Sequence, residues 1–203
     1  MNKGSLKTYR EKRNFRRTPE PEERRKKRDG KKPIFTVQKH AARQLHYDFR
    51  LQVGHKLKSW AVPKGPSVDP KDKRMAVEVE DHPLAYAKFE GVIPDGEYGA
   101  GTVMVWDIGT FRNISKRDHK EVTITRAFES GHVAVWLQGK RLRGGYALRR
   151  IAAGKKPRWL LIKMRDEEAD SRRNLTKIET KSALSGRTMK QITKEAEASQ
   201  APC

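Results

Sequence analysis

Residues 38–51 read QKHAARQLHYDFRL, and this stretch decides the fold of the chain. From Leu45 to Leu51 apolar and polar residues alternate without a break, which is the pattern of a strand that buries one face. The two faces carry, in turn, Leu45, Tyr47, Phe49 and Leu51 on the apolar side, and His46, Asp48 and Arg50 on the polar side. The stretch therefore predicts a strand that packs into a core and presents three reactive side chains on its other face.

The polar face of this strand has the composition of a metal site. Its successive side chains are spaced about 7 Å apart, and His40, six residues upstream of His46, can turn back toward the same face. Two imidazoles and a carboxylate suit a divalent transition metal such as Mn, Fe or Zn. An arginine beside such a metal suits phosphate, which its guanidinium binds through two parallel hydrogen bonds. The alternative is a half-buried strand whose polar face is only solvated.

The chain is strongly basic. Its 203 residues include 46 Lys and Arg against 25 Asp and Glu, which gives a formal net charge of +21 and a pI of about 10.3. This excess favours a polyanionic partner, and nucleic acid is the usual one. The net charge is +9 over residues 1–33, +11 over residues 34–164 and +1 over residues 165–203, so the expected core is itself basic.

Composition also argues against several classes of protein. No segment approaches the roughly 18 apolar residues of a membrane span, and we find no signal peptide, so a membrane partner is not expected. The single cysteine, Cys203, excludes an intramolecular disulfide and a cysteine-rich zinc site. We therefore expect a monomeric, cytoplasmic and nucleoid-associated protein.

Short alternating stretches, bounded by glycine and proline, recur through the middle of the chain. They predict strands at residues 35–39, 45–53, 57–62, 74–80, 102–107, 121–125, 132–137, 145–150 and 159–164. A helical turn is expected at residues 84–89, and a turn-rich connection at residues 91–101. Many short strands with few helical windows predict a mainly β chain, with one antiparallel β-barrel-like domain, short helical segments and flexible basic tails.

The same patterns divide the chain into a basic N-terminal arm, a β-barrel domain and a flexible C-terminal tail: residues 1–33, 34–164 and 165–203. Within the arm, residues 22–33 lack apolar anchors, and we expect them to stay disordered and to help hold nucleic acid. Residues 9–20 are expected to dock on the core when substrate is present. Within the tail, residues 166–182 are expected to be loose, and residues 189–198 to form a short helix with Thr188 as its N-cap.

Further polar groups lie next to the ends of the predicted strands. Lys64 is in a Pro-Lys-Gly-Pro turn, and Arg74 opens a strand. His82 and Tyr86 are four residues apart, so one helical turn would bring them to the same side. Each of these groups has an ordinary structural explanation, such as a solvated strand end or a structural hydrogen bond. None of them indicates a function alone.

Three long blocks of sequence resemble a known family. They are HAARQLHYDFRL at residues 40–51, SWAVPKGPSVDPKDKRMAVEVEDHPLAYAKFEG at residues 59–91, and IPDGEYGAGTVMVWD at residues 93–107. They are similar to the 3′-phosphoesterase domain of bacterial ATP-dependent DNA ligase D, and the resemblance extends from Tyr9 to Met164. No ligase or polymerase sequence follows, so a stand-alone form of this domain is expected.

The resemblance implies a manganese-dependent enzyme, for which other divalent transition metals remain possible. Such an enzyme removes a 3′-terminal ribonucleoside from DNA, then removes the remaining 3′-phosphate, and leaves a 3′-hydroxyl for repair ligation in end joining. The expected partners are DNA or RNA-terminated DNA 3′ ends, a DNA ligase and Ku-like end-joining proteins. The competing hypothesis is a non-catalytic DNA-binding accessory protein of end joining, which would not need the complete set of ligand residues.

The resemblance also implies roles for individual residues. The metal ligands of the family match His40, His46 and Asp48. Its phosphate-contacting, catalytic and supporting residues match Arg50, His82, Tyr86, Gln38, Lys64, Arg74, Arg13 and Glu20. The chain departs from the family at Asn14, where an aspartate is expected. A protonated His82 would either stabilise developing charge or protonate the leaving oxygen, and the sequence leaves both roles open.

Overall fold

The computed structural model describes residues 6–22 and 32–200 of the chain. Its barrel strands are β1 (Ile34–Ala41), β2 (Leu45–Val53), β3 (Lys56–Val62), β4 (Lys73–Pro83), β6 (Gly101–Asn113), β9 (His132–Gly139), β10 (Arg143–Ala152) and β11 (Arg158–Lys163). Its smaller elements are α1 (Lys7–Glu11), the 3₁₀ helix η1 (Leu84–Lys88), β5 (Gly91–Ile93), β7 (Lys116–Arg117), β8 (Lys120–Glu121), α2 (Ile124–Ser130), α3 (Leu175–Ile178) and α4 (Met189–Gln200). None of the helices in this part of the chain is long and apolar enough to cross a membrane.

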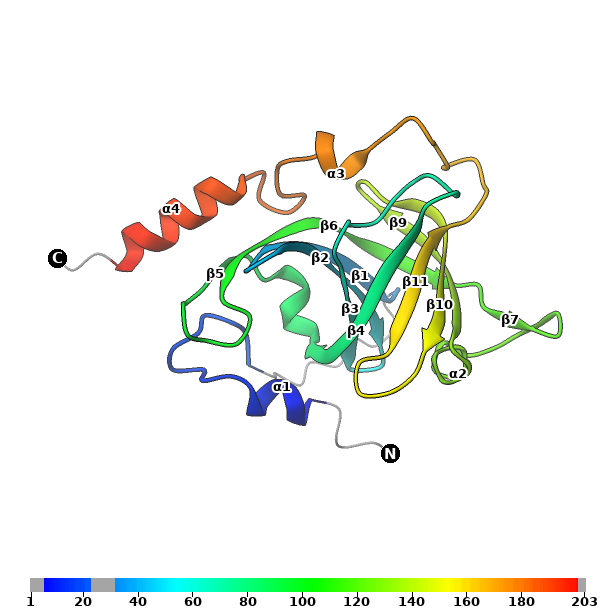
Figure 1. The fold of residues 1–203 in the computed structure, drawn as a ribbon, viewed down its shortest axis with the longest axis horizontal. Coiled ribbons are helices and arrows are strands. Elements are labelled where there is room, and N and C mark those ends of the chain that lie inside the picture. The colour runs from blue at the N-terminus through cyan, green and yellow to red at the C-terminus, as the bar shows by residue number, and fades with distance from the viewer. Residues whose placement is uncertain (1–5, 23–31, 201–203) are drawn as a thin grey trace.

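Eight antiparallel strands close into a barrel in the order β1-β2-β3-β4-β11-β10-β9-β6 (Figure 1). The barrel closes because β6 pairs with β1 along one edge and with β9 along the other. The short strand β5 pairs with the start of β6, on the edge of β6 opposite to β1. This architecture confirms the prediction of a mainly β chain with a single antiparallel barrel.

The barrel interior is built from the apolar face of each strand. In β2, the side chains of Tyr47, Phe49 and Leu51 are buried in this core, as the alternation predicts. Leu45 differs, because it lies next to the β1–β2 turn and is 50% exposed. The opposite face of β2 therefore lies outside the barrel, and its polar side chains are covered by other segments.

The strand predicted at residues 121–125 is wrong, because α2 begins within this stretch. The Thr123 hydroxyl accepts a hydrogen bond from the backbone N–H of Arg126 (3.3 Å) and caps the helix. The following turn buries Ala127 and Phe128 in the barrel core. The apolar residues of this segment thus follow a helical period, and α2 closes one end of the barrel.

The segment at residues 166–182, which we expected to be loose, contacts the barrel instead. Leu175 of α3 is 3% exposed and belongs to the interior core. The indole Nε1 of Trp106 in β6 donates a hydrogen bond to the carbonyl oxygen of Glu179 (2.9 Å). Figure 1 shows α3 and α2 at opposite ends of the barrel. The buried leucine and this hydrogen bond both hold an otherwise polar segment on the barrel.

Both ends of the described chain add further contacts. Tyr9 of α1 is fully buried, and its hydroxyl donates a hydrogen bond to the carbonyl oxygen of Pro21 (2.8 Å). The N-terminal segment, residues 6–22, is therefore docked in the structure itself, whereas residues 23–31 of the predicted arm lie outside the described residues. The predicted C-terminal helix is present as α4, and the Thr188 hydroxyl accepts a hydrogen bond from the backbone N–H of Gln191 (3.3 Å).

The packing of α3 gives a testable prediction. Leu175→Ala is expected to lower the free energy of unfolding by about 2–4 kcal/mol, because it leaves a cavity in the core. Urea denaturation followed by tryptophan fluorescence measures this loss. Ile178→Ala is the matched control in the same helix, because Ile178 is 60% exposed, and its loss should cost less than about 0.5 kcal/mol. Equal losses for the two variants would contradict the packing of this segment on the barrel.

Candidate metal and phosphate site

Three side chains on the outer face of β1 and β2 form a cluster with the donor set of a metal site. His40 is the second-last residue of β1, and His46 and Asp48 lie on β2, so the hairpin pairing brings them together. One nitrogen of each histidine and one carboxylate oxygen lie within 4.8 Å of one another. Each facing histidine nitrogen, Nδ1 of His40 and Nε2 of His46, is 3.7 Å from an Asp48 oxygen.

Backbone carbonyls orient both histidines of this cluster. The Nε2 of His40 lies 2.8 Å from the carbonyl oxygen of Gly99, and the Nδ1 of His46 lies 2.9 Å from the carbonyl oxygen of Gln44. Because a carbonyl only accepts hydrogen bonds, these two nitrogens carry the protons in the neutral rings. The other nitrogen of each ring then offers its lone pair toward Asp48. The donor set, with its outer hydrogen bonds, fits a divalent transition metal.

Asp48 also contacts Arg50 on the same strand face. The Nη2 of Arg50 donates a hydrogen bond to Oδ2 of Asp48 (3.0 Å), and both side chains are buried. Burial alone would raise the pKa of Asp48, but opposing effects, led by the positive charge of Arg50, hold that pKa well below its usual value. The carboxylate therefore stays ionised, as a metal ligand must.

The guanidinium of Arg50 is held on its other side by Gln38. Its Nε donates a hydrogen bond to Oε1 of Gln38 (2.7 Å). The amide Nε2 of Gln38 donates to the carbonyl oxygens of Tyr86 (3.0 Å) and Phe89 (2.9 Å) at the η1 turn. Gln38 thus fixes the guanidinium to the backbone of η1, so Arg50 has little freedom to rotate.

His82 lies between two guanidinium groups. Its Nδ1 is 2.8 Å from Nη1 of Arg50, and its Nε2 is 3.3 Å from Nη2 of Arg13. Burial, followed by the positive charges of Arg50 and Arg13, lowers the pKa of His82 well below its ordinary value. This shift favours a neutral ring in the resting protein, and the role of a protonated His82 toward phosphate stays a prediction. β4 also extends to Pro83, so His82 belongs to a strand and not to the following turn.

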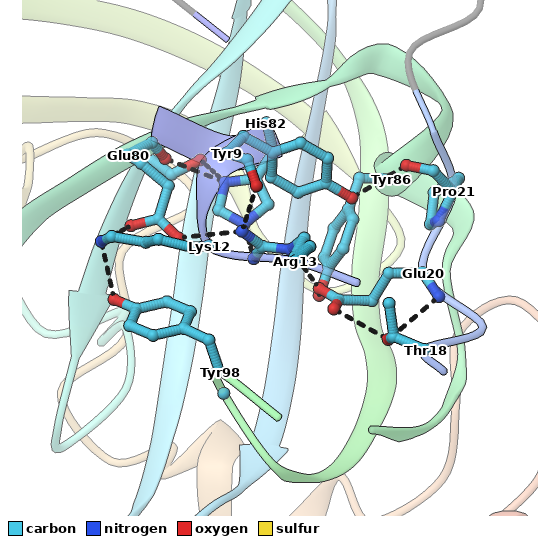
Figure 2. A network of polar contacts seen from close by, with 12 residues as sticks. Tyr9, Lys12, Arg13, Thr18, Glu20, Pro21, Glu80, His82, Tyr86 and Tyr98 are labelled. Atoms are coloured by element: carbon cyan, nitrogen blue, oxygen red, sulfur yellow. Dashed lines mark hydrogen bonds and ion pairs between the residues drawn. The ribbon is translucent and has the colours of Figure 1, made fainter. Parts of the chain in front are cut away.

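The N-terminal segment supplies Arg13 and Glu20 to the same group (Figure 2). The Nε of Arg13 donates a hydrogen bond to Oε1 of Glu20 (2.8 Å), and the hydroxyl of Tyr86 donates to the same oxygen (3.0 Å). The rings of His82 and Tyr86 are 4.6 Å apart in an edge-on contact. Burial, followed by the charge of Glu20, raises the pKa of Tyr86 well above its ordinary value, so the phenol stays protonated and donates.

Nine of the eleven residues singled out in the sequence are thus brought together, and two lie apart from them. Arg74 donates a hydrogen bond through Nη2 to Asp72 (2.6 Å), and its Nε is buried without a partner. Arg74 occupies the same face of β4 as Ala76, which packs in the interior core. Lys64 also acts electrostatically on Asp72. A role of these two cations toward substrate stays a prediction.

The structure adds Glu80 to this group, a residue that sequence reasoning missed. Its carboxylate accepts hydrogen bonds from Lys12 (3.2 Å) and Arg13 (3.3 Å), and its backbone carbonyl lies 2.9 Å from Nδ1 of His82. Glu80 and His82 are two residues apart, so strand alternation could have placed them on one face. The partnership with Arg13, 67 positions earlier, had no signal in the sequence.

A known family has a sequence that matches the part of the chain carrying this arrangement. A family model described as the DNA ligase D 3′-phosphoesterase domain matches residues 38–150, which include the barrel strands around the cluster. The chain belongs to this family.

The relatives are much longer proteins. The chain is 48% identical over 188 residues to the multifunctional non-homologous end joining protein LigD of Pseudomonas aeruginosa. The matched region covers 91% of this chain and 22% of that protein. It is 41% identical over 163 residues to the multifunctional non-homologous end joining DNA repair protein LigD of Mycobacterium tuberculosis, covering 80% of this chain and 20% of that protein. The chain therefore spans about a fifth of the length of these relatives.

Asn14, where the family resemblance leads us to expect aspartate, lies in an exposed turn. Its Oδ1 accepts a hydrogen bond from the backbone N–H of Arg16 (3.1 Å). Its carbonyl oxygen accepts from the backbone N–H groups of Arg17 (2.8 Å) and Thr18 (3.0 Å). An aspartate would accept the same bonds, so this position supports the turn that leads to Glu20.

We therefore predict that the natural protein is active and that Asn14→Asp changes its rate by about tenfold or less, or roughly 1.4 kcal/mol in the barrier. The measurement is turnover of a 3′-phosphate primer by both versions across a Mn²⁺ titration. An inert natural protein that Asn14→Asp converts into a fast enzyme would instead make position 14 a metal ligand.

Proposed function

We propose that this protein is a metal-dependent phosphoesterase that heals DNA 3′ ends. It removes a 3′-terminal ribonucleoside as a phosphodiesterase, and then removes the remaining 3′-phosphate, leaving a 3′-hydroxyl for repair ligation. One observation carries the proposal: a donor set for a divalent cation shares Asp48 with a guanidinium suited to phosphate. Family membership agrees with phosphoester chemistry.

In this proposal His40, His46 and Asp48 hold Mn²⁺, and other divalent transition metals would also suit the same donors. When bound, the cation supplies Lewis acidity at a phosphoryl oxygen and activates water for attack. Asp48 brings the negative charge of the ligand set. The two histidines enter as neutral ligands, because their outer nitrogens donate to backbone carbonyls.

Arg50 binds the substrate phosphate next to the metal ligands. Three of its five N–H groups point to Gln38, Asp48 and His82, so two remain for phosphate oxygens. Because Gln38 and Asp48 already fix the plane of the guanidinium, little side-chain freedom is lost when phosphate binds. The positive charge then opposes the negative charge that develops on the phosphoryl oxygens during transfer.

Arg13 and His82 complete the phosphate pocket from the other side. In the resting protein, burial and then the charges of the two arginines keep His82 neutral. A bound phosphate carries the opposite charge, so it raises the pKa of His82 again and lets the ring gain a proton. His82 can then stabilise the phosphate or pass its proton to the leaving oxygen. Glu20, Glu80 and Tyr86 keep Arg13 and His82 in position.

The names of the relatives refer to non-homologous end joining, which supports a role of this protein in the same repair process. The basic charge of the chain, +21 overall, suits a DNA substrate. A DNA ligase and Ku-like proteins are the partners that would use the 3′-hydroxyl product, and the nucleoid of a bacterial cytoplasm is where they would meet it.

The proposal predicts metal-dependent conversion of a primer-template that ends in one 3′-ribonucleotide. With Mn²⁺ the primer should shorten to a 3′-phosphate and then to a 3′-hydroxyl, and EDTA should stop both steps. His46→Ala should lower turnover by at least about a hundredfold, because it removes a metal ligand. The matched control is His55→Ala, in the exposed β2–β3 turn, which should keep full activity. DNA binding without any turnover at saturating Mn²⁺ would favour the non-catalytic accessory protein.

A further inference from the structure

A group of exposed cations lies on a part of the barrel that the proposed site does not use. Residues 110–160 contain 13 Lys and Arg against 3 Asp and Glu. We call six of them the distal basic surface; all six are exposed, and they are Arg112, Lys116, Arg117, Lys120, Arg126 and Arg149. This concentration of one charge requires an explanation, because like charges at close range repel.

These cations outnumber their acidic neighbours, which in the hairpin are Asp118 at the tip and Glu121 opposite Lys116. In the part of the chain that the structure describes, none of the six forms an ion pair. Cations near the proposed site behave differently. Lys12 and Arg13 pair with Glu80, and Arg17 pairs with Glu97. The distal basic surface therefore keeps a net positive charge that is available for an anion from outside.

The six cations gather around the first half of β9. Arg112 of β6 pairs with Trp136, and Arg149 of β10 pairs with His132, so the two arginines flank β9 on the same outer face. The segment that carries β7 and β8 is attached to this strand by the hydroxyl of Ser115, which donates a hydrogen bond to the carbonyl oxygen of Ala134 (3.1 Å).

The base of this hairpin is further fixed by Asn113, whose Nδ2 donates a hydrogen bond to the carbonyl oxygen of Val122 (2.7 Å). Its tip turns through Asp118 and His119, which both have positive φ angles of 49° and 62°. Figure 1 shows the β7 hairpin projecting beyond the barrel, on the side away from β5 and α4. The cations of the hairpin are therefore presented outward from a fixed base.

Strand β6 sets the distance between the two regions. Val103 pairs with His40 of the candidate metal cluster, and β6 ends at Asn113, where the hairpin begins. At about 3.3 Å per residue, the ten steps between them span at most about 33 Å. One turn of B-DNA, 10 base pairs, is about 34 Å long. A duplex whose 3′ end lies at the cluster can thus reach the hairpin after about one turn.

We propose that the distal basic surface binds the phosphate backbone of duplex DNA about one helical turn away from the 3′ end that is processed. This inference rests on the proposed function for the identity of its substrate. Its exposed Lys and Arg side chains suit phosphate oxygens, and contacts with phosphates do not depend on base sequence. It would hold the duplex while successive groups are removed from its end.

The test compares two stem-loop DNAs that end in a 3′-hydroxyl, with stems of 24 and 6 base pairs. A 6-base-pair stem is only about 20 Å long and cannot reach from the cluster to the hairpin. Dissociation constants are measured in EDTA over a range of salt, so no turnover enters. The variant is Arg117→Gln/Lys120→Gln/Arg126→Gln. The control, Lys177→Gln/Lys190→Gln/Lys194→Gln, removes the same charge from exposed positions of α3 and α4.

For the 24-base-pair stem, the magnitude of the slope of log K against log salt should fall by about two to three in the Arg117→Gln/Lys120→Gln/Arg126→Gln variant. Each lost phosphate contact accounts for about 0.9 of this fall. The dissociation constant of this variant should rise at least about tenfold. The control should bind like the natural protein, and all three should bind the short stem alike. An unchanged slope for the long stem, or an equal loss for both stems, would overturn the proposal. If DNA binding changes as predicted but the protein shows no turnover, the inference about the distal basic surface stands and only the proposed function is rejected.

Discussion

The contact between Asp48 and Arg50 is the interaction on which the site depends. It joins two buried, oppositely charged side chains at 3.0 Å, and removing either partner would leave a buried charge at a cost of about 3–5 kcal/mol. One oxygen of Asp48 accepts from Arg50, and the other faces His46. A single carboxylate therefore belongs to both halves of the site. In the proposed function, this one side chain, on one strand of a closed barrel, would set the spacing between a metal at the histidines and a phosphate at the guanidinium.

The rest of the site is arranged outward from that contact. Gln38 ties Arg50 to the backbone of η1, and His82 lies between Arg50 and Arg13. The barrel supplies the rigid side of the pocket, because its strands are fixed by pairing on both edges. The N-terminal segment supplies Arg13 and is held by Glu20 and by the buried Tyr9. Two parts of the chain that are far apart in sequence thus form one network of charges, which together with burial lowers the pKa of His82 well below its ordinary value.

The sequence predicts the features that follow from a local pattern of residues. It does not predict features that depend on one residue or on a contact with a residue far away in the sequence. Strict alternation in β2 predicted which face is buried and which carries Asp48 and Arg50. At residues 121–125 the alternation of Val122 and Ile124 suggested a strand, but the Thr123 cap and the burial of Phe128 favour a helix. Residues 166–182 are too polar to predict order, yet Leu175 reaches the core. The contact between Glu80 and Arg13 depends on the docking of α1, which no local pattern predicts.

The central claim is that His40, His46 and Asp48 bind the metal while Arg50 acts on phosphate. Calorimetric titration of Mn²⁺ into the natural protein, His46→Ala and Arg50→Lys tests it most directly, with turnover of a 3′-phosphate primer measured on the same samples. We predict that His46→Ala loses Mn²⁺ binding. Arg50→Lys should bind Mn²⁺ within about threefold of the natural protein but turn over at least about a hundredfold more slowly, because a lysine cannot reproduce the paired hydrogen bonds of the guanidinium. Normal Mn²⁺ binding by His46→Ala would contradict the account.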